Sequence, residues 1–300
     1  MPLRLLGGTG NPALLDATGR ALGIAPEERV LERFPDGELH VVLQRSQRAA
    51  HMVIVQPTGP PVDEHLVELV MLADAATRAG AARVTAVMPY FGYARQDHRG
   101  TAGEAIGAKA IARLIEAAGI GQLVLVDPHS PALETMFDVP VNTLTAVPIL
   151  TASLQVFRGD DAVVVAPDLG AVKLAERYAA ALDLPVAVVR KTRLSGATVH
   201  AVDLVGDVRD RRPLIVDDMI TTAGTVEAAA RALLDRGCRR EIVVAATHGL
   251  FVGSAQSRLA ALPLRRVLVT DTVPTSESDL PLSVIGIAGL LADALTSLGQ

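Results

Sequence analysis

The chain has 300 residues, with 28 Lys and Arg against 33 Asp and Glu, and its formal net charge of -5 argues against a general nucleic-acid binder, which should be basic. No apolar run approaches the ~18 residues that a membrane span requires, and the first residues lead into a Gly-rich turn rather than a secretory signal. The single cysteine, Cys238, cannot form an internal disulfide or a zinc site, so we expect a cytoplasmic protein that binds neither nucleic acid nor membrane.

Short β-branched runs alternate with Ala- and Leu-rich stretches along most of the chain. Strands without polar alternation, separated by stretches with apolar residues at helical spacing, are typical of parallel sheets covered by helices on both faces. The sequence therefore predicts an α/β protein. The expected order is strand 53–55, helix 64–78, strand 84–88, helix 103–118, strands 123–126 and 162–166, helix 172–181, strands 186–189 and 214–216, helix 226–236, and strands 242–246 and 267–269.

Two stretches of the chain echo one another. A strand, a loop, a helix and a second strand fill residues 53–88, and the same sequence of elements fills residues 214–246 at nearly the same length. Any two βαβ units look alike, so the echo alone is equally compatible with chance. Together with the length, it suggests two domains of similar fold, 1–145 and 146–300.

The most informative segment is 214–225, where a buried strand ends in two adjacent acids and a turn of small residues then opens a helix. Small residues let backbone N–H groups wrap a phosphate, and the helix N-terminus adds a favourable dipole. The two carboxylates can accept from sugar hydroxyls or help to hold hydrated Mg²⁺. An ordinary N-cap would explain Thr225, but not the whole set. The candidate residues are Asp217, Asp218, Thr221, Thr222, Ala223, Gly224 and Thr225.

This segment resembles the phosphoribosyl-diphosphate loop of type I phosphoribosyltransferases and of ribose-phosphate pyrophosphokinases. Five further segments are similar to segments of the pyrophosphokinases and are not expected in an ordinary phosphoribosyltransferase. They occur in the order and at the spacing of the pyrophosphokinases, and the similarity runs from about Phe34 to the C-terminus. The resemblance implies two type I phosphoribosyltransferase-like domains, each a mostly parallel sheet flanked by helices. The five segments are 34–38 and 89–97 for ATP, 126–130 and 166–168 for metal, and 190–193 for the catalytic flexible loop.

The two segments that resemble ATP-binding segments have a chemical interpretation of their own. Phe34 offers an aromatic face to a purine, and Asp36 and Glu38 can accept from its exocyclic amine, although Pro-Asp-Gly is also ordinary turn chemistry. Arg95 suits phosphate recognition, and a polar loop is the alternative. Residues 90–93 hold three of the chain's eight aromatic side chains, which favours a binding surface. The ATP-binding candidates are Phe34, Asp36, Gly37, Glu38, Arg95, Gln96 and Asp97.

Two residues that follow buried strands are candidate metal ligands. Mg²⁺ prefers oxygen ligands and a lone histidine is more often structural, so the metal role of His129 is implied by the resemblance alone. Asp168 is a carboxylate just beyond a strand, and its alternative role is to cap the helix that begins near residue 172.

Lysine is scarce, and its three occurrences are Lys109, Lys173 and Lys191. Chance is sufficient for the first two. Lys191 lies between Arg190 and Arg193, and three cations within four residues repel one another unless an anion is near. A solvated basic loop is the usual alternative, but the family resemblance implies that Lys191 and Arg193 are catalytic and that Arg193 also contacts ribose 5-phosphate.

The implied reaction converts ATP and ribose 5-phosphate into AMP and 5-phosphoribosyl 1-diphosphate, with Mg²⁺ as cofactor. In this family the loop of Phe34 usually reaches in from a neighbouring subunit, which implies a homo-oligomer that is at least a dimer and commonly a hexamer. A phosphoribosyltransferase that consumes the diphosphate, and a regulatory paralogue without activity, are the alternatives.

Two departures from the family pattern concern charge. Thr221 replaces a common acid, which removes a negative charge near the expected 5-phosphate. Residues 98–104 differ from the Arg- and Lys-rich stretch that helps to form the family's allosteric site, so activation by phosphate, inhibition by ADP and strict preference for ATP stay open.

Overall fold

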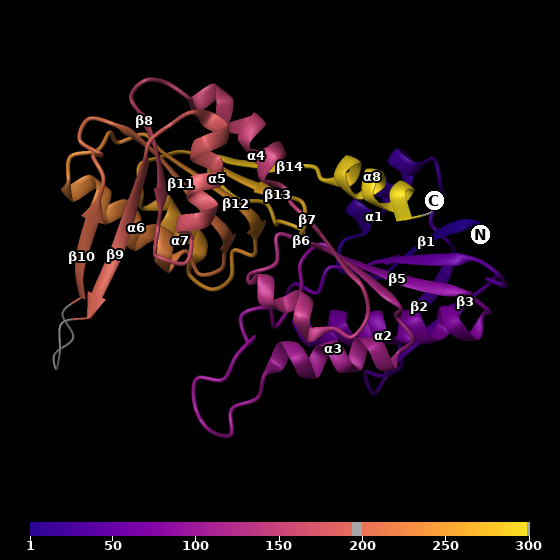
Figure 1. Cartoon of the computed structure of the whole chain (residues 1–300). Coiled ribbons are helices and arrows are strands. Elements are labelled where there is room, and N and C mark those ends of the chain that lie inside the picture. The colour runs from indigo at the N-terminus through magenta and orange to yellow at the C-terminus, as the bar shows by residue number, and fades with distance from the viewer. Residues whose placement is uncertain (194–199, 299–300) are drawn as a thin grey trace. The chain divides into compact units, whose positions relative to one another are not determined.

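The computed structural model describes residues 1–193 and 200–298, without the side chains of 191–193 and 200–202 (Figure 1). The chain divides into two compact units. The first comprises Met1–Thr145, Thr272–Pro274 and the C-terminal residues from Gly286, and the second comprises Ala146–Asp271 and Thr275–Ile285.

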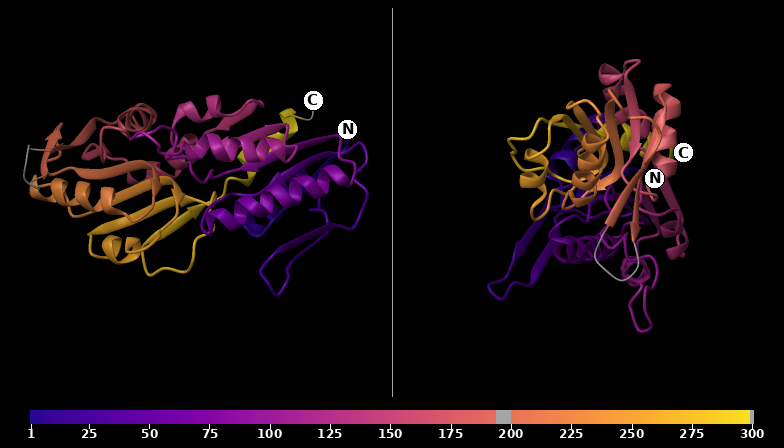
Figure 2. Two further views of the ribbon diagram at one scale, coloured as in Figure 1. Left: turned by 90° about the horizontal axis from the view of Figure 1, so that it is seen from below. Right: turned by 90° about the vertical axis from the view of Figure 1, so that its left-hand side faces the viewer.

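The first unit is a parallel sheet between two layers of helices, with a separate hairpin (Figures 1 and 2). The strand order is β1-β4-β5-β6-β7, and every neighbouring pair is parallel. Strands β2 and β3 form the antiparallel hairpin. The elements are β1 (Leu3–Gly7), α1 (Pro12–Leu22), β2 (Arg29–Arg33), β3 (Leu39–Leu43), β4 (His51–Val55), α2 (Val62–Arg78), β5 (Arg83–Met88), α3 (Gly107–Ala117), β6 (Gln122–Val126), the 3-10 helix η1 (Pro131–Met136), β7 (Val141–Leu144) and α8 (Ala288–Leu298).

The core of the first unit explains why its central strands lack polar alternation. All residues of β4 and β6 are buried, because helices cover both faces of the sheet. Ile54 and Leu123 pack with Leu69 of α2 and Ile115 of α3 in one apolar cluster. Helices α1 and α8 pack against each other on the opposite face (Figure 1).

The second unit repeats this architecture with a longer sheet. The order is β10-β9-β8-β11-β12-β13-β14, in which only the edge pair β10–β9 is antiparallel. Helices α6 and α7 share a core with the central strands. The elements are α4 (Val147–Leu154), the 3-10 helix η2 (Gln155–Phe157), β8 (Ala162–Ala166), α5 (Val172–Leu182), β9 (Val186–Arg193), β10 (His200–Val205), β11 (Arg212–Ile220), α6 (Gly224–Asp235), β12 (Ile242–Gly249), α7 (Ala255–Ala260), β13 (Leu264–Thr270) and β14 (Leu282–Ile285).

The α/β prediction is confirmed, since a strand occupies each of the expected strand positions and both sheets are mostly parallel. The helix expected from residue 103 begins instead at Gly107. Gly103 has a φ of 84°, which a right-handed helix cannot contain, and the Glu104 carboxylate folds back to accept from the N–H groups of Gly100 (2.8 Å) and Thr101 (2.9 Å). The sequence also places residues 286–298 in the second domain, whereas α8 belongs with the first unit.

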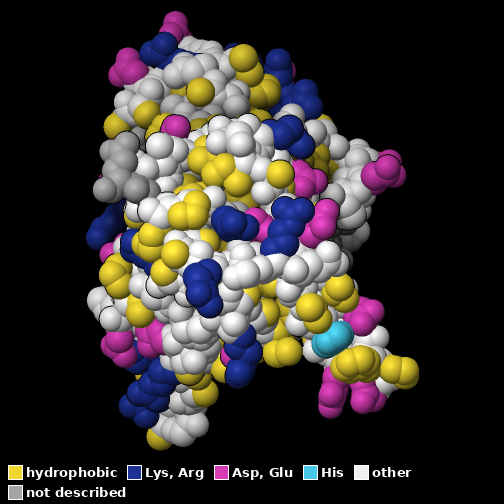
Figure 3. All heavy atoms as spheres, turned by 90° about the vertical axis from the view of Figure 1, so that its right-hand side faces the viewer, with side chains coloured by type: hydrophobic (Ala, Val, Ile, Leu, Met, Phe, Trp, Pro, Cys, Tyr) yellow, Lys and Arg dark blue, Asp and Glu magenta, His cyan; other side chains and the backbone are white. Residues whose placement is uncertain are grey.

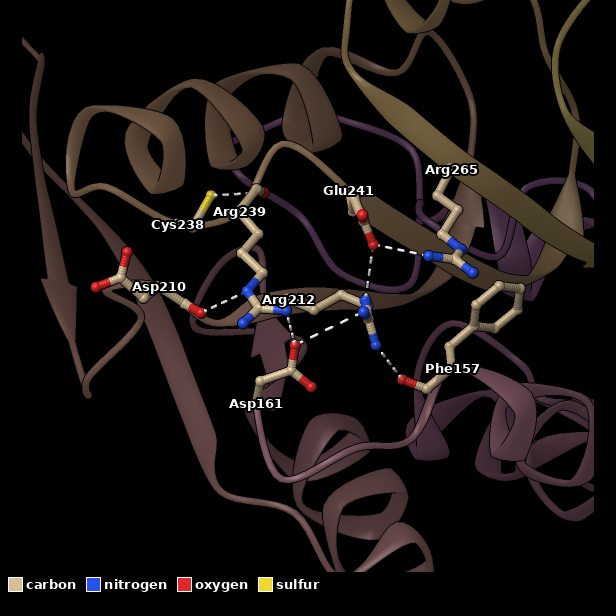
Figure 4. Close-up of polar contacts among 8 residues, drawn as sticks. All are labelled: Phe157, Asp161, Asp210, Arg212, Cys238, Arg239, Glu241 and Arg265. Atoms are coloured by element: carbon tan, nitrogen blue, oxygen red, sulfur yellow. Dashed lines mark hydrogen bonds and ion pairs between the residues drawn. The ribbon is translucent and has the colours of Figure 1, made fainter.

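An ion-pair network closes the amino-terminal edge of the second unit's sheet (Figure 4). Arg212, at the start of β11, lies 3.2 Å from Glu241 and 3.6 Å from Asp161. Arg239 also pairs with Asp161, and Arg265 of β13 lies 2.7 Å from Glu241. Hydrogen bonds from Arg265 and then Arg212 lower the pKa of Glu241. These charges hold the amino ends of neighbouring strands together. Ligands of open α/β sheets bind at the opposite edge, where the carboxyl ends of the strands lie.

We expect the stability of the first unit to fall as the pH falls below about 6.5, because His51 is buried without charge. Its side chain is 3% exposed and its Nε2 lies 2.8 Å from the Thr85 hydroxyl. Burial, and then the nearby Arg83, lower the pKa of His51, so below its ordinary pKa the unfolded chain takes up a proton that the folded chain does not.

Urea unfolding of the wild type and of His51→Gln at pH 7, 6 and 5 measures this effect. The glutamine can still hydrogen-bond to Thr85 but does not titrate, so the loss, at most about 1.4 kcal/mol per pH unit, should be smaller in the variant. Equal losses in the two proteins would contradict this account.

Within residues 1–193 and 200–298, no helix has both the length and the apolar character required to span a bilayer.

Candidate active site

Three carboxylates of the second unit gather at the carboxyl edge of its sheet. Strands β8 and β11 are parallel neighbours, Asp168 follows β8, and Asp217 and Asp218 lie near the carboxyl end of β11. Burial raises the pKa of Asp217 well above its usual range, and the charges of Asp218 and Asp168 raise it further. Such a concentration of negative charge favours a bound cation or a hydrogen-bond donor.

The sequence suggested that the strand ends at Asp217 and Asp218, and this prediction was wrong. β11 continues to Ile220, because its ladder with β12 extends to the pairs Met219–His248 and Ile220–Gly249. Asp217 is therefore held inside a paired strand, which fixes its position more firmly than a loop would.

Asp168 closes the turn that leads into α5, although the N-cap residue of that helix is Ala171 and has no side-chain cap bond. Asp168 Oδ1 accepts from the N–H groups of Gly170 (2.9 Å) and Ala171 (3.2 Å), and Ala171 precedes the first residue of α5. A carboxylate has two oxygens and several lone pairs, so this contact is compatible with a metal on the same group. The metal role of Asp168 stays a prediction.

In the part of the chain that the structure describes, no group of three or more His, Cys, Asp or Glu side chains is arranged to hold a metal ion. Mg²⁺ usually keeps several waters and takes only one or two protein carboxylates, with substrate phosphates completing its shell. The carboxylate of Asp168 is therefore chemically suited to hold a magnesium ion together with a bound phosphate compound.

The turn after β11 has the local geometry of an anion cradle. Ala223 has a left-handed φ of 59°, and α6 begins at the next residue, Gly224. A left-handed residue at the start of a helix brings successive N–H groups together, and the helix dipole acts at the same point. Thr222 is exposed and Thr225 is half-buried, so both hydroxyls are within reach of a ligand.

The Gly-rich turn after β1 in the first unit is closed by a protein carboxylate instead. Thr9 donates from its N–H (2.6 Å) and its hydroxyl (2.8 Å) to Glu68, and Gly10 donates from its N–H to Gln56 (3.3 Å). Glu68 is only 3% exposed, so it takes the donors that an external anion would need. Of these two turns, the one after β11 is the candidate phosphate site.

At the carboxyl edge of the first unit, the segment after β5 meets the segment after β6. Asp97 Oδ1 lies 2.5 Å from His98 Nδ1, and a hydrogen bond to Ser130 supplements that contact. Both bonds lower the pKa of Asp97, with His98 as the larger cause. Arg95 and His129 are exposed. The structure thus brings a predicted ATP segment beside the predicted metal histidine.

The aromatic side chains that precede Arg95 do not form a binding surface, so that interpretation was wrong for two of them. Tyr90 and Phe91 are 5% and 3% exposed, and Phe91 packs edge-on against Phe137 at 5.7 Å between ring centroids. Tyr93 donates its hydroxyl hydrogen to Asp63 at 2.6 Å. These rings anchor the loop in the core and place Arg95 and Gln96 outside it.

The hairpin β2–β3 projects from the first unit, and the space-filling view shows acidic and hydrophobic side chains gathered with a histidine on this lobe (Figure 3). Phe34 at its tip is 45% exposed and stacks on His40 at 5.1 Å. Gly37 has a φ of 95° and donates its N–H to the carbonyl of Phe34 (2.8 Å), while Asp36 accepts from the N–H of Glu38 (3.1 Å). The turn interpretation therefore holds, and it leaves the aromatic ring accessible.

Lys191 and Arg193 belong to the end of β9, but their side chains lie outside the described part of the structure, as do residues 194–199. Two residues near the sites were not among the candidate residues, although Ser130 lies in the segment 126–130. Ser130 bonds Asp97, and Arg258 of α7 donates to the carbonyl of Thr222 (3.3 Å). Neither has a local signal, because each contact joins segments more than 30 residues apart.

Comparisons with known proteins cover both units. A family model for the N-terminal domain of ribose phosphate pyrophosphokinase matches residues 3–119, and a model for the phosphoribosyl transferase domain matches residues 149–259. The chain is 40% identical to the ribose-phosphate pyrophosphokinase of Gloeobacter violaceus over 296 residues, which cover 98% of this chain and 89% of that protein.

The protein of the same name from Caldanaerobacter subterraneus is 39% identical over 296 residues, covering 98% of this chain and 93% of the relative. Among solved structures, phosphoribosylpyrophosphate synthetase from Mycobacterium smegmatis superposes with a TM-score of 0.94 at 34% identity, covering 100% of this chain and 99% of that one.

Proposed function

The chain belongs to the ribose-phosphate pyrophosphokinase family and is a ribose-phosphate diphosphokinase, and from this premise we propose which of its residues bind ATP, ribose 5-phosphate and metal. The reaction transfers the diphosphoryl group of ATP to the 1-hydroxyl of ribose 5-phosphate and releases AMP. The observation that carries the assignment is the pair of acids in β11 followed by the left-handed turn that opens α6.

Ribose 5-phosphate binds to this turn. The backbone N–H groups and hydroxyls of residues 221–225 receive the 5-phosphate at the positive end of the α6 dipole. Asp217 and Asp218 accept hydrogen bonds from the ribose hydroxyls, which places the sugar over the end of β11 with its 1-hydroxyl free to react. Donation from the sugar also relieves the repulsion between the two carboxylates.

ATP binds to segments of the first unit's fold. The exposed ring of Phe34 stacks on the adenine, and Asp36 and Glu38 accept from the exocyclic amine. Arg95 binds the phosphates in a multidentate manner, and Gln96 and Asp97 complete the contacts. Because the hairpin of Phe34 projects from its own unit (Figure 2), we assign it to the active site of a neighbouring copy, within a homo-oligomer that is at least a dimer.

Mg²⁺ is the proposed metal, with Asp168 and His129 as its protein partners. The hard carboxylate oxygens and the crowded charge around Asp217 fit this ion. When bound, it neutralises phosphate oxygens and makes the β-phosphorus easier to attack.

The protein's own residues then orient the reaction. Asp217 and Asp218 hold the sugar so that its 1-hydroxyl oxygen loses its proton and forms a bond to the β-phosphorus of ATP while the bond to the AMP oxygen breaks in line. Lys191 and Arg193 close over the transferring group, stabilise its developing charge and keep water out.

We expect Asp168→Asn to raise the Mg²⁺ concentration that gives half-maximal activity by roughly tenfold or more, because an amide is a poorer magnesium ligand than a carboxylate. The assay follows AMP release from ATP and ribose 5-phosphate. The matched control is Asp183→Asn, which makes the same change at a 93% exposed side chain at the other end of α5.

An unchanged magnesium requirement in Asp168→Asn would remove Asp168 from the metal site. A wild-type protein that releases no AMP when ribose 5-phosphate is added would contradict the activity itself.

A further inference from the structure

Residues 250–258, the segment that follows β12, bind the backbone carbonyls of the proposed phosphate turn. The N–H groups of Leu250 and Phe251 donate to the carbonyl of Ile220 at 2.9 and 3.1 Å. The N–H group of Val252 donates to the carbonyl of Thr221 at 3.0 Å. Two consecutive carbonyls of the turn are therefore bound by the backbone of one neighbouring segment.

The next carbonyl of the turn is bound by a side chain of the same segment. Arg258 Nη1 lies 3.3 Å from the carbonyl oxygen of Thr222. The guanidinium also lies close against Gly224, where an added Cβ would approach Nη1 to 2.8 Å. Gly224 has no positive φ, so its backbone does not demand glycine. The absence of a side chain at this position makes room for Arg258.

These three carbonyl contacts set the direction of the N–H groups that would receive a phosphate. In a planar trans peptide, the C=O of one residue and the N–H of the next point in opposite directions. Because the carbonyls of residues 220–222 are held by the segment after β12, the N–H groups of Thr221, Thr222 and Ala223 point away from it. The turn is thereby preorganised with its donors on the ligand side.

The guanidinium of Arg258 is itself oriented by an acid in the first turn of α6. Its Nε lies 3.4 Å from Glu227 Oε2, and Arg231 bonds the other carboxylate oxygen of Glu227 at 2.8 and 3.2 Å. Two cations share one carboxylate, so the group carries a net positive charge at the helix end that faces the turn. This charge adds to the attraction of the α6 dipole for an anion.

We propose that Arg258 is a positioning residue of the ribose 5-phosphate site, which fixes the Thr222 peptide and contributes positive charge beside the bound 5-phosphate. The proposal rests on the assignment of residues 221–225 to that phosphate. Arg258 touches neither the reacting atoms nor the segments assigned to ATP, so its loss should weaken the sugar phosphate alone.

The test compares Arg258→Ala, Arg258→Lys and Arg231→Ala by steady-state kinetics with each substrate varied in turn. We expect Arg258→Ala to raise KM for ribose 5-phosphate about tenfold, the loss of one charge-assisted contact, with KM for ATP changed less than about twofold. Arg258→Lys keeps the charge and should recover part of the loss. Arg231→Ala removes a cation from the same acid without touching the turn, and should raise KM for ribose 5-phosphate much less than Arg258→Ala does, with KM for ATP near wild type.

An unchanged KM for ribose 5-phosphate in Arg258→Ala would overturn the proposal, and so would an equal rise in both KM values, which a general structural loss would produce. If the alanine variant does not fold, Arg258→Met, which keeps the packed stem, replaces it with the same expected results.

Thr225→Ala separates failure of the proposal from failure of the site. If Thr225→Ala raises KM for ribose 5-phosphate and Arg258→Ala does not, the site stands and Arg258 is not part of it. If neither variant changes that KM, residues 221–225 do not bind the 5-phosphate, and both assignments are overturned.

Discussion

Lys191→Ala should lower kcat by roughly two or more orders of magnitude while the KM values for ATP and ribose 5-phosphate change little. As AMP leaves, negative charge develops on the oxygen that bridged the α- and β-phosphorus and on the oxygens around the β-phosphorus, and a cation placed there acts mainly in the transition state. Arg190, Lys191 and Arg193 are adjacent at the end of β9, and their mutual repulsion is relieved when such an anion is present.

The matched control for this variant is Lys173→Ala, which removes a lysine from α5 and should leave kcat unchanged. Lys191→Arg retains the charge in a different shape and should recover part of the rate. Full turnover by Lys191→Ala would show that the charge at this position is dispensable and would leave Arg193 as the catalytic cation to test.

The interpretation of the scarce lysines was wrong for Lys109, and for Lys191 it stays a prediction. Lys109 was attributed to chance, yet its Nζ donates to the carbonyl of Met136 (2.7 Å) at the end of η1 and lies 3.5 Å from Asp138. A cation at the end of a helical turn is stabilising there. Composition alone cannot distinguish such a capping lysine from a catalytic one, because both depend on what surrounds the side chain in the fold.

The central strands were predictable because they are buried on both faces. β4, β6 and β8 are apolar throughout their buried length or nearly so, which no surface segment would tolerate. The hairpin β2–β3 was not predicted, because most of its residues are half-buried or exposed and its charged positions hide the strand period. The helix α8 was placed in the wrong unit for another reason, since no local pattern records which sheet a terminal helix packs against.

The location of the candidate site was predictable from topology, and its detailed contacts were not. Asp168 and His129 follow buried strands, Asp217 lies near the carboxyl end of another, and parallel strands bring such residues to one edge within each sheet. The burial of Tyr90 and Phe91 could not be predicted, because an aromatic run after a strand suits a core as well as a ligand surface. The contact of Arg258 with Thr222 joins residues 36 apart in the chain, and no local sequence pattern around either residue indicates it.

Asp217→Asn should make the ligand-free protein more stable and the enzyme nearly inactive. Asp217 is half-buried near the carboxyl end of β11, and both its burial and the charges of Asp218 and Asp168 disfavour its ionised form. An amide of the same shape removes this repulsion, so we expect a gain of about 1–2 kcal/mol in the free energy of unfolding without metal or substrate. The same change removes an acceptor from the ribose hydroxyls, and kcat/KM for ribose 5-phosphate should fall by about 100-fold or more.

Denaturant unfolding in a chelator, paired with the AMP assay, measures both effects, and Asp160→Asn, at an exposed carboxylate of the same unit, should change neither. The stability gain should shrink when Mg²⁺ and ribose 5-phosphate are present, because they neutralise or bond Asp217 in the wild type and cannot do so in the variant. If Asp217→Asn were less stable than the wild type in the chelator, the Asp217 carboxylate would be stabilised by its contacts and not destabilised by burial and repulsion. If the stability gain shrinks as expected, the ligands relieve the repulsion among Asp168, Asp217 and Asp218 that the folded protein carries without them.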